Sequence, residues 1–187
     1  MTMNRVQPIF WAIVACLITS TPSYAQEPRR VELNAQLGIV SGLGTHGSFG
    51  GGVGMDLTRR IRGYGELSYI PLGGANSSFA GFGEADASAK AINFNVGGQY
   101  QFRRAGRVEP YAGLGLGMLH VSSSYRSSFL GVTVSGESSS NHFYVNLGGG
   151  LRYHVSERWG FRPELMIFAG SDAYVRLGGG VFYYLGR

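Results

Sequence analysis

Apolar and polar residues alternate along eight stretches of the chain between residues 31 and 185. Alternation with a period of two is typical of β-strands, because successive side chains of a strand point to opposite faces. No stretch keeps a 3.6-residue period, and beyond residue 30 no apolar run reaches the roughly 20 residues of a membrane-spanning helix. The pattern predicts eight strands, at residues 31–39, 48–57, 62–69, 92–102, 108–118, 142–153, 161–167 and 174–185.

The two faces of these strands differ in chemistry. One face is apolar throughout and carries aromatic residues near the strand ends, whereas the other holds glycine, Asn, Gln and charges of both signs. Glycines and paired charges would line a ligand pocket poorly, which disfavours a soluble lipocalin-like barrel. Apolar residues outside and polar residues inside are typical of outer-membrane barrels, and closure leaves no unpaired strand edge in lipid. The expected fold class is all-β: an eight-stranded antiparallel up-and-down transmembrane β-barrel.

The connections between the predicted strands alternate in length. Short turns, most of them rich in Arg, follow the second, fourth and sixth strands, at residues 59–60, 103–107 and 154–158. Long stretches rich in Ser, Gly and Ala follow the third and fifth strands, at residues 72–88 and 122–140, and are predicted to be flexible loops that face outside. The Arg side chains suit the anionic headgroups of the periplasmic side, with their stems along apolar surface. Both termini are therefore predicted to be periplasmic.

Residues 1–25 have the three parts of an export signal. Arg5 precedes an apolar run at residues 9–18, and a small-x-small pattern ends at Ala25. We expect cleavage after Ala25, which leaves residues 26–187 as the barrel domain. The one cysteine, Cys16, lies within the signal, so the mature chain has no thiol chemistry. The residues before Cys16 resemble a lipoprotein cleavage box, which leaves lipidation as an alternative.

Composition narrows the possible functions further. Most of the net charge of +5 lies at the turns, so it gives little support to nucleic-acid binding. His46, His142 and His154 are assigned to different loops and turns, without the spacing of metal ligands. The Gly-rich stretch 47–54 lacks the Lys-Ser/Thr ending of a phosphate-binding loop and is predicted to be a strand. We expect no metal, no cofactor and no nucleic-acid partner.

Strand parity places nine charged residues on the inner face of the predicted barrel. Five acids nearly balance four bases, and the interior of an eight-stranded barrel is only just wide enough for side chains to fill it. Unpaired charges in such a space would be costly. We favour a lumen plugged by salt bridges; the alternative is a narrow pore for small ions or solutes. The predicted network comprises Glu32, Asp56, Arg62, Glu66, Glu109, Arg152, Arg162, Glu164 and Arg176.

Four segments carry a family resemblance that spans about residues 31–187. They are RGYGELSYIPL (62–72), RVEPYAGLGLG (107–117), FRPELMIFAG (161–170) and RLGGGVFYYLGR (176–187). On these segments the chain resembles the small eight-stranded outer-membrane β-barrel family, similar to the OmpA and OmpX type of transmembrane domain. The resemblance implies a place in the outer membrane of a Gram-negative cell, among its lipids and lipopolysaccharide. It also implies insertion by the outer-membrane assembly machinery, which reads the last strand.

A His-x-Ser motif at residues 120–122 is the candidate for catalysis. By parity, His120 and Ser122 lie on the lipid-facing side at the outer rim, and Glu137 could approach from the following loop. The set resembles the His/Ser/Glu constellation of the outer-membrane lipid A deacylases, in which the histidine activates the serine for ester hydrolysis. The alternative is a histidine and serines at a membrane interface, and the sequence favours this alternative.

Taken together, these patterns predict a monomeric, non-enzymatic outer-membrane protein. Its expected role is structural, or lies in surface contact through the two long outer segments. Transport through a narrow pore is the second hypothesis, and lipid A hydrolysis by His120 and Ser122 is the third.

Overall fold

Strands make up most of the chain in the computed structural model, which describes residues 30–42, 44–79, 83–129 and 132–185. The predicted export signal, with Cys16, lies outside the described residues. Within them, no helix is long and apolar enough to cross a membrane. The strands are β1 (Val31–Ser41), β2 (His46–Asp56), β3 (Ile61–Phe79), β4 (Gly83–Gln101), β5 (Val108–Phe129), β6 (Val132–His154), β7 (Trp159–Gly170) and β8 (Ala173–Leu185).

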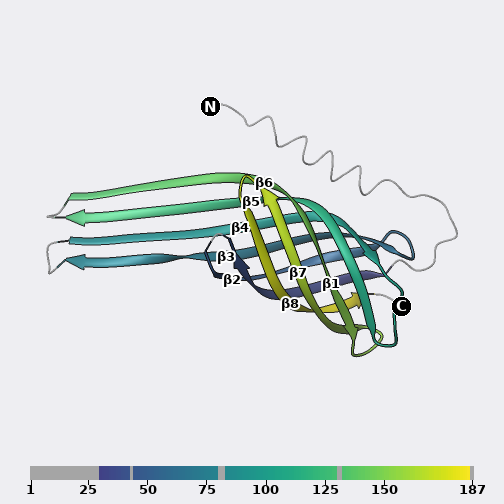
Figure 1. Cartoon of the computed structure of the whole chain (residues 1–187). Coiled ribbons are helices and arrows are strands. Elements are labelled where there is room, and N and C mark those ends of the chain that lie inside the picture. The colour runs from purple at the N-terminus through teal and green to yellow at the C-terminus, as the bar shows by residue number, and fades with distance from the viewer. Residues whose placement is uncertain (1–29, 43, 80–82, 130–131, 186–187) are drawn as a thin grey trace.

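The eight strands form a closed barrel in which each strand pairs antiparallel with the next (Figure 1). The barrel closes where β8 pairs with β1, in a register that runs from Val31 opposite Leu185 to Ser41 opposite Val175. The strands are arranged around the barrel in the order of the sequence, without a crossover. The predicted fold class, an eight-stranded antiparallel up-and-down barrel, is confirmed.

The described residues of the two stretches predicted to be long loops lie in strands, so the prediction of loops there is wrong. β3 stays paired with β4, β4 with β5 and β5 with β6 as far as the ends of these strands. Most of their residues are small or polar, yet backbone hydrogen bonds still join the strands. We call this extension of the barrel wall the protruding sheet (Figure 1); it consists of residues 70–79, 83–91, 121–129 and 132–140.

β3 changes register where it enters the protruding sheet. Pro71 lies opposite Lys90, but Gly73 lies opposite Ala89, so Leu72 is an extra residue in the ladder. Gly73 has a φ of 104°, a conformation that L side chains rarely adopt. Leu72 packs against the buried cluster at this end of the lumen. The bulge therefore joins the protruding sheet to the packed interior of the barrel.

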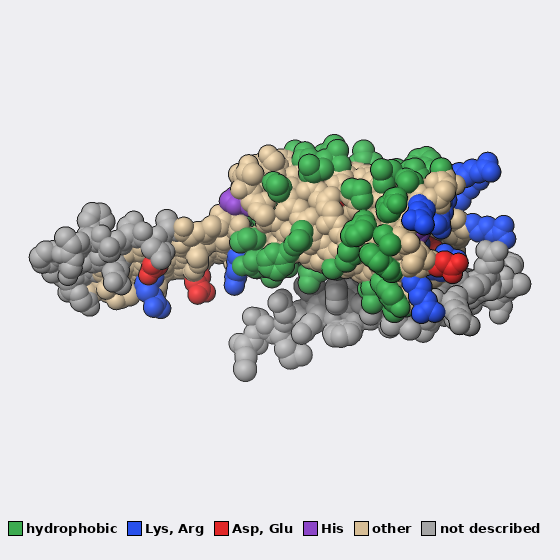
Figure 2. All heavy atoms as spheres, turned by 90° about the horizontal axis from the view of Figure 1, so that it is seen from below, with side chains coloured by type: hydrophobic (Ala, Val, Ile, Leu, Met, Phe, Trp, Pro, Cys, Tyr) green, Lys and Arg blue, Asp and Glu red, His purple; other side chains and the backbone are tan. Residues whose placement is uncertain are grey.

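The barrel wall is apolar outside, as parity predicts, and its inside carries polar and small residues together with a buried apolar and aromatic cluster. Outward residues such as Leu37, Phe143 and Leu177 are exposed, whereas Asn95 and Arg152 are buried in the lumen. In Figure 2, apolar side chains are spread over the barrel, and most of the basic side chains in view (blue) lie at the end opposite the protruding sheet, with others on the sheet itself. This arrangement suits a wall that faces lipid and turns that face charged headgroups.

Inner glycines make room for large side chains that cross the lumen. The Tyr64 ring lies close to Gly97, and its hydroxyl lies close to Gly115. The Tyr144 hydroxyl lies against Gly117 in the same way. A side chain at any of these glycines would collide with a tyrosine, so the glycines serve packing rather than weaken the strands.

Candidate functional site

The lumen holds all nine charged residues that parity placed there, and Glu32 lies at the centre of their network. Glu32 is 1% exposed and forms ion pairs with three arginines. Its carboxylate pairs with Arg62, with Arg152 at 3.0 Å and with Arg162 at 3.3 Å. These partners come from β3, β6 and β7, so one carboxylate from β1 links strands on several sides of the barrel.

A second group of charges lies next to Arg162. Glu66 and Glu164 each pair with both Arg162 and Arg176, at distances between 2.5 and 3.6 Å. Tyr111 donates a hydrogen bond of 2.6 Å to Glu164. Because each carboxylate has two cationic partners, the four charges form a closed ring that is joined to Glu32 through Arg162.

The lumen near the short turns holds the remaining charges. The Arg62 guanidinium lies 2.6 Å from Asp56, and the nearest Arg152 and Glu109 atoms are 3.9 Å apart. Glu109 also lies 3.1 Å from Nε2 of His154. The assignment of His154 to a turn is wrong, because it is the last residue of β6 and is buried in the lumen.

The other two histidines also lie in strands, and for His142 this agrees with the predicted strand at residues 142–153, which begins with it. His46 begins β2, and His142 lies within β6. Among the described residues, no group of three His, Cys, Asp or Glu side chains is placed to hold a metal ion.

Aromatic and amide side chains fill the end of the lumen beneath the protruding sheet. Phe168 stacks on Tyr174 with ring centroids 4.4 Å apart, and Tyr144 meets Phe168 edge to face. The Tyr144 hydroxyl is hydrogen-bonded to Asn93 and Asn95. Around these rings lies a buried apolar cluster that includes Ile70, Ala91, Val40, Leu119 and Met166. The lumen is thus charged toward the short turns and aromatic toward the protruding sheet.

Several of the polar residues that complete the lumen were not among the predicted site residues. Gln99 accepts a hydrogen bond from Arg152, Gln36 accepts one from Arg162, and the Tyr184 hydroxyl accepts one from Arg62. Their inward parity in the sequence was the available signal, since inward polar residues of a narrow barrel lie close to one another. Parity alone does not identify the partners, because these depend on how the strands are staggered around the barrel.

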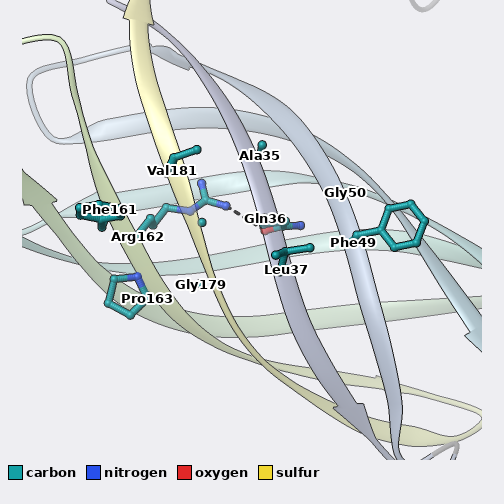
Figure 3. Close-up of a pocket in the computed structure, with 11 residues that line it drawn as sticks. Ala35, Gln36, Leu37, Phe49, Gly50, Phe161, Arg162, Pro163, Gly179 and Val181 are labelled. Atoms are coloured by element: carbon teal, nitrogen blue, oxygen red, sulfur yellow. Dashed lines mark hydrogen bonds between the residues drawn. The ribbon is translucent and has the colours of Figure 1, made fainter.

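The outer wall carries an apolar groove of about 740 Å³. Figure 3 shows Leu37, Phe49, Phe161 and Pro163 around it. Gly179 lies between them, and a side chain at Gly179 would meet no other atom within 4 Å. Gln36 and Arg162 also line the groove, and a hydrogen bond of 3.3 Å joins them. Because most of the lining is apolar and the groove lies on the lipid-facing wall, acyl chains of the surrounding membrane suffice to cover it.

The His-x-Ser motif lies on the outer face, where β5 passes from the barrel into the protruding sheet. The Ser122 hydroxyl lies 3.0 Å from Nε2 of His120, and Nδ1 of His120 lies 2.7 Å from Oδ1 of Asn141. Glu137, expected to approach from a loop, lies on β6 opposite Ser124 and lines the same groove as His120 and Ser122, but it is not the hydrogen-bond partner of Nδ1 of His120. The partner of the histidine is an amide on the neighbouring strand, which the sequence did not identify.

A closed eight-stranded barrel with an apolar outer wall and a polar interior defines a class: the small β-barrels of the outer membrane. The chain belongs to the outer membrane protein beta-barrel domain family, whose model matches residues 11–181. The protein is therefore an outer-membrane barrel. A comparison with curated proteins gives no match.

Solved structures of other outer-membrane barrels share this fold. Neisserial surface protein A is 14% identical, with 84% of this chain and 97% of that chain covered and a TM-score of 0.56. The N-terminal β-barrel domain of Pseudomonas aeruginosa OprF is 18% identical, with 83% of this chain and 97% of that chain covered and a TM-score of 0.55. Ail, the attachment invasion locus protein of Yersinia pestis, is 15% identical, with 84% of this chain and 97% of that chain covered and a TM-score of 0.52. At these identities the likeness extends to the fold alone.

Proposed function

We propose that this protein is a surface-contact protein: a plugged barrel anchors the protruding sheet at the outer surface of the cell. Contact of this kind is non-enzymatic, since no bond is made or broken. The observation that carries the proposal is the protruding sheet itself, four paired strands that continue beyond the lipid-facing wall. The apolar wall would be covered by outer-membrane lipids and lipopolysaccharide, with the protein as a monomer.

The orientation follows from the two ends of the barrel. The short turns at one end carry Arg59, Arg60, Arg103, Arg104 and Arg158, and cationic side chains near a membrane surface are attracted by anionic headgroups. The protruding sheet is at the other end, where its polar side chains require water. We place the turns and both termini on the periplasmic side and the protruding sheet outside the cell.

The protruding sheet offers two strand edges for contact. β2 pairs with β3 only as far as Tyr69, and β7 pairs with β6 only from Tyr144. The outer parts of β3 and β6 therefore have one side each without a neighbouring strand. Exposed strand edges bind extended segments of other proteins through backbone hydrogen bonds. The partner that fits is a polypeptide with an extended, unpaired segment.

Binding to an extended polypeptide tests the contact role. Proteoliposomes with the purified barrel should adhere to reduced and carboxymethylated lactalbumin, and a variant without residues 75–87 and 125–136 should not. Both barrels must show a gel mobility that changes on boiling, which reports that each is folded. Equal adherence of the two barrels, or equal adherence to native albumin, would contradict a role for the strand edges.

Paired charges support the plug over the narrow pore. Each of the five lumen carboxylates has an Arg within 4 Å, and aromatic rings occupy the outer half of the lumen. We expect the folded barrel to pass no current in a planar lipid bilayer. Stable single-channel steps would instead support the pore, with Glu109 and Arg162 as candidates for its selectivity.

A further inference from the structure

Two hydrogen bonds link Ser122, His120 and Asn141 on the outer face of the wall. Oδ1 of Asn141 accepts but does not donate hydrogen bonds, so the 2.7 Å contact requires a proton on Nδ1 of His120. A neutral imidazole protonated on Nδ1 leaves Nε2 as an acceptor. The Ser122 hydroxyl, 3.0 Å away, therefore donates to Nε2. This is the arrangement of a nucleophile, a general base and a group that orients the base.

The position of these residues matches the edge of the lipid-facing wall. His120 and Asn141 are directly opposite each other on β5 and β6. Two residues further along these strands toward the barrel, the same face is apolar and exposed, with Leu67, Phe94 and Phe143. Two residues in the opposite direction, Ser122 lies directly opposite Lys90, whose side chain is exposed. The three residues thus lie between a surface for acyl chains and a cation at the height of lipid headgroups.

A groove gives this edge the room that a substrate needs. Its volume is about 840 Å³, and Ser122, His120, Lys90 and Tyr69 are among the residues that line it. This volume is within the usual range for small-molecule sites, about 300–1,000 Å³. The nucleophile therefore faces a groove that is open to the outer leaflet.

We propose that Ser122, His120 and Asn141 form a serine esterase site that cleaves carboxyl esters of anionic outer-leaflet lipids. Ser122 is the nucleophile, His120 the general base and acid, and Asn141 the residue that positions His120. Lys90 binds the phosphate of the lipid headgroup. This activity is separate from surface contact, which depends on the protruding sheet beyond the groove.

The reaction uses two ordinary acyl-transfer steps and water. Ser122 Oγ forms a bond to the ester carbonyl carbon while its proton moves to Nε2 of His120. The bond between the carbonyl carbon and the alcohol oxygen then breaks, and His120 returns the proton to that oxygen. Water, with His120 again as base, cleaves the acyl-serine to a free fatty acid and regenerates Ser122.

A second Ser-His pair in the same molecule provides a matched control. Ser140 lies 3.0 Å from Nε2 of His142, whose Nδ1 lies 3.1 Å from the Ser171 hydroxyl. This pair is on β6, and strand parity directs it toward the inner face. It has neither an amide orienter nor the lipid-facing groove, so Ser140 is not expected to act as a nucleophile.

The first test uses the barrel refolded in detergent micelles with p-nitrophenyl octanoate. We expect Ser122→Ala and His120→Ala to lower the turnover at least about 100-fold, the usual contribution of a general base, and Ser140→Ala to leave it unchanged. A fluorophosphonate probe should label Ser122 in the wild type. All variants must keep a gel mobility that changes on boiling. If the folded wild type hydrolyses no more ester than Ser122→Ala, the proposal is overturned.

The second test identifies the substrate class. The wild type is placed in vesicles of phospholipid and lipopolysaccharide, and mass spectrometry follows the loss of acyl chains from either lipid. Loss that disappears in Ser122→Ala and weakens several-fold in Lys90→Ala supports an anionic lipid ester. Turnover of the soluble ester without any loss from either lipid would overturn the lipid as substrate.

The role of Asn141 is tested by rescue, since a purely structural residue would not show it. Asn141→Ala should lower ester turnover, and Asn141→Asp should restore it, because a carboxylate also accepts the proton on Nδ1 of His120. A loss of the same size in both variants, with the fold intact, would contradict a positioning role.

Discussion

The same four strands behave differently inside the barrel and in the protruding sheet. In the barrel, β3 to β6 alternate between exposed apolar side chains such as Leu116 and buried polar ones such as Asn146. In the protruding sheet, one face carries charged and hydroxyl side chains such as Arg126 and Ser124, and the other mixes small residues such as Ala87 and Gly136 with the exposed side chain of Tyr125. Backbone pairing is continuous through both parts. Alternation of apolar and polar residues therefore depends on the surroundings of a strand, and a segment without it can still be a strand.

The barrel and the protruding sheet also differ in what stabilises them. The barrel encloses buried charges and packed rings, so its stability depends on particular side-chain partners. The protruding sheet has few buried side chains, and its backbone ladder tolerates many sequences. Mutations in the lumen should therefore be costly and mutations in the protruding sheet inexpensive, and the predictions below test that contrast.

The largest effect is expected at Glu32. Glu32→Ala leaves Arg62, Arg152 and Arg162 buried without their shared carboxylate, and loss of one partner from a buried ion pair costs about 3–5 kcal/mol. Glu137→Ala, on the exposed protruding sheet, should change the free energy of unfolding by about 0.5 kcal/mol or less. Urea unfolding in lipid vesicles measures both. A similar loss for the two variants would contradict the contrast.

A smaller effect is expected from neighbouring glycines of β4. A methyl group at Gly97 would collide with the Leu114 carbonyl oxygen and lie 2.8 Å from the Tyr64 ring, whereas at Gly98 it would meet no atom within 4 Å. Gly97→Ala should therefore cost about 1–3 kcal/mol, as overpacking usually does. Gly98→Ala serves as the matched control, with little or no loss in the same urea titration.

The smallest effect on the barrel is expected from removal of the protruding sheet. Gly74 and Ser88 are cross-strand partners, as are Ser124 and Glu137, so an Asn-Gly turn can join each pair. Because few apolar contacts are lost, the free energy of unfolding should fall by no more than about 1 kcal/mol. A barrel that no longer inserts or that unfolds readily after this deletion would show that the sheet supports the wall.

Sequence patterns identified the barrel because lipid and a narrow lumen impose opposite chemistry on the two faces of each strand. Parity alone sufficed to assign Glu66 and Arg176 to the inside. That these two residues lie 2.5 Å apart could not be predicted, since they come from β3 and β8 and meet only across the lumen. Such contacts depend on the stagger of the closed sheet.

The outer part of the chain was less predictable for a related reason. The serines and glycines of β5 and β6 resemble a loop, because no burial constrains their pattern. Because these segments are strands, the register between β5 and β6 determines the neighbours of His120. It places Asn141 rather than Glu137 beside the histidine. The candidate esterase site thus needed the pairing of β5 with β6, which the composition of the chain does not reveal.

The place of Glu32 in the first strand has a consequence for the order of assembly. Its three arginine partners come from β3, β6 and β7, and β1 reaches its final place only when it pairs with β8. Until that seam forms, Arg152 and Arg162 lack the Glu32 carboxylate and keep only other partners, such as Glu109 and Glu164. Closure of the seam therefore completes charge neutralisation and edge pairing in one event. An intermediate with seven strands in place would be strongly disfavoured, so insertion into the membrane should be all-or-none.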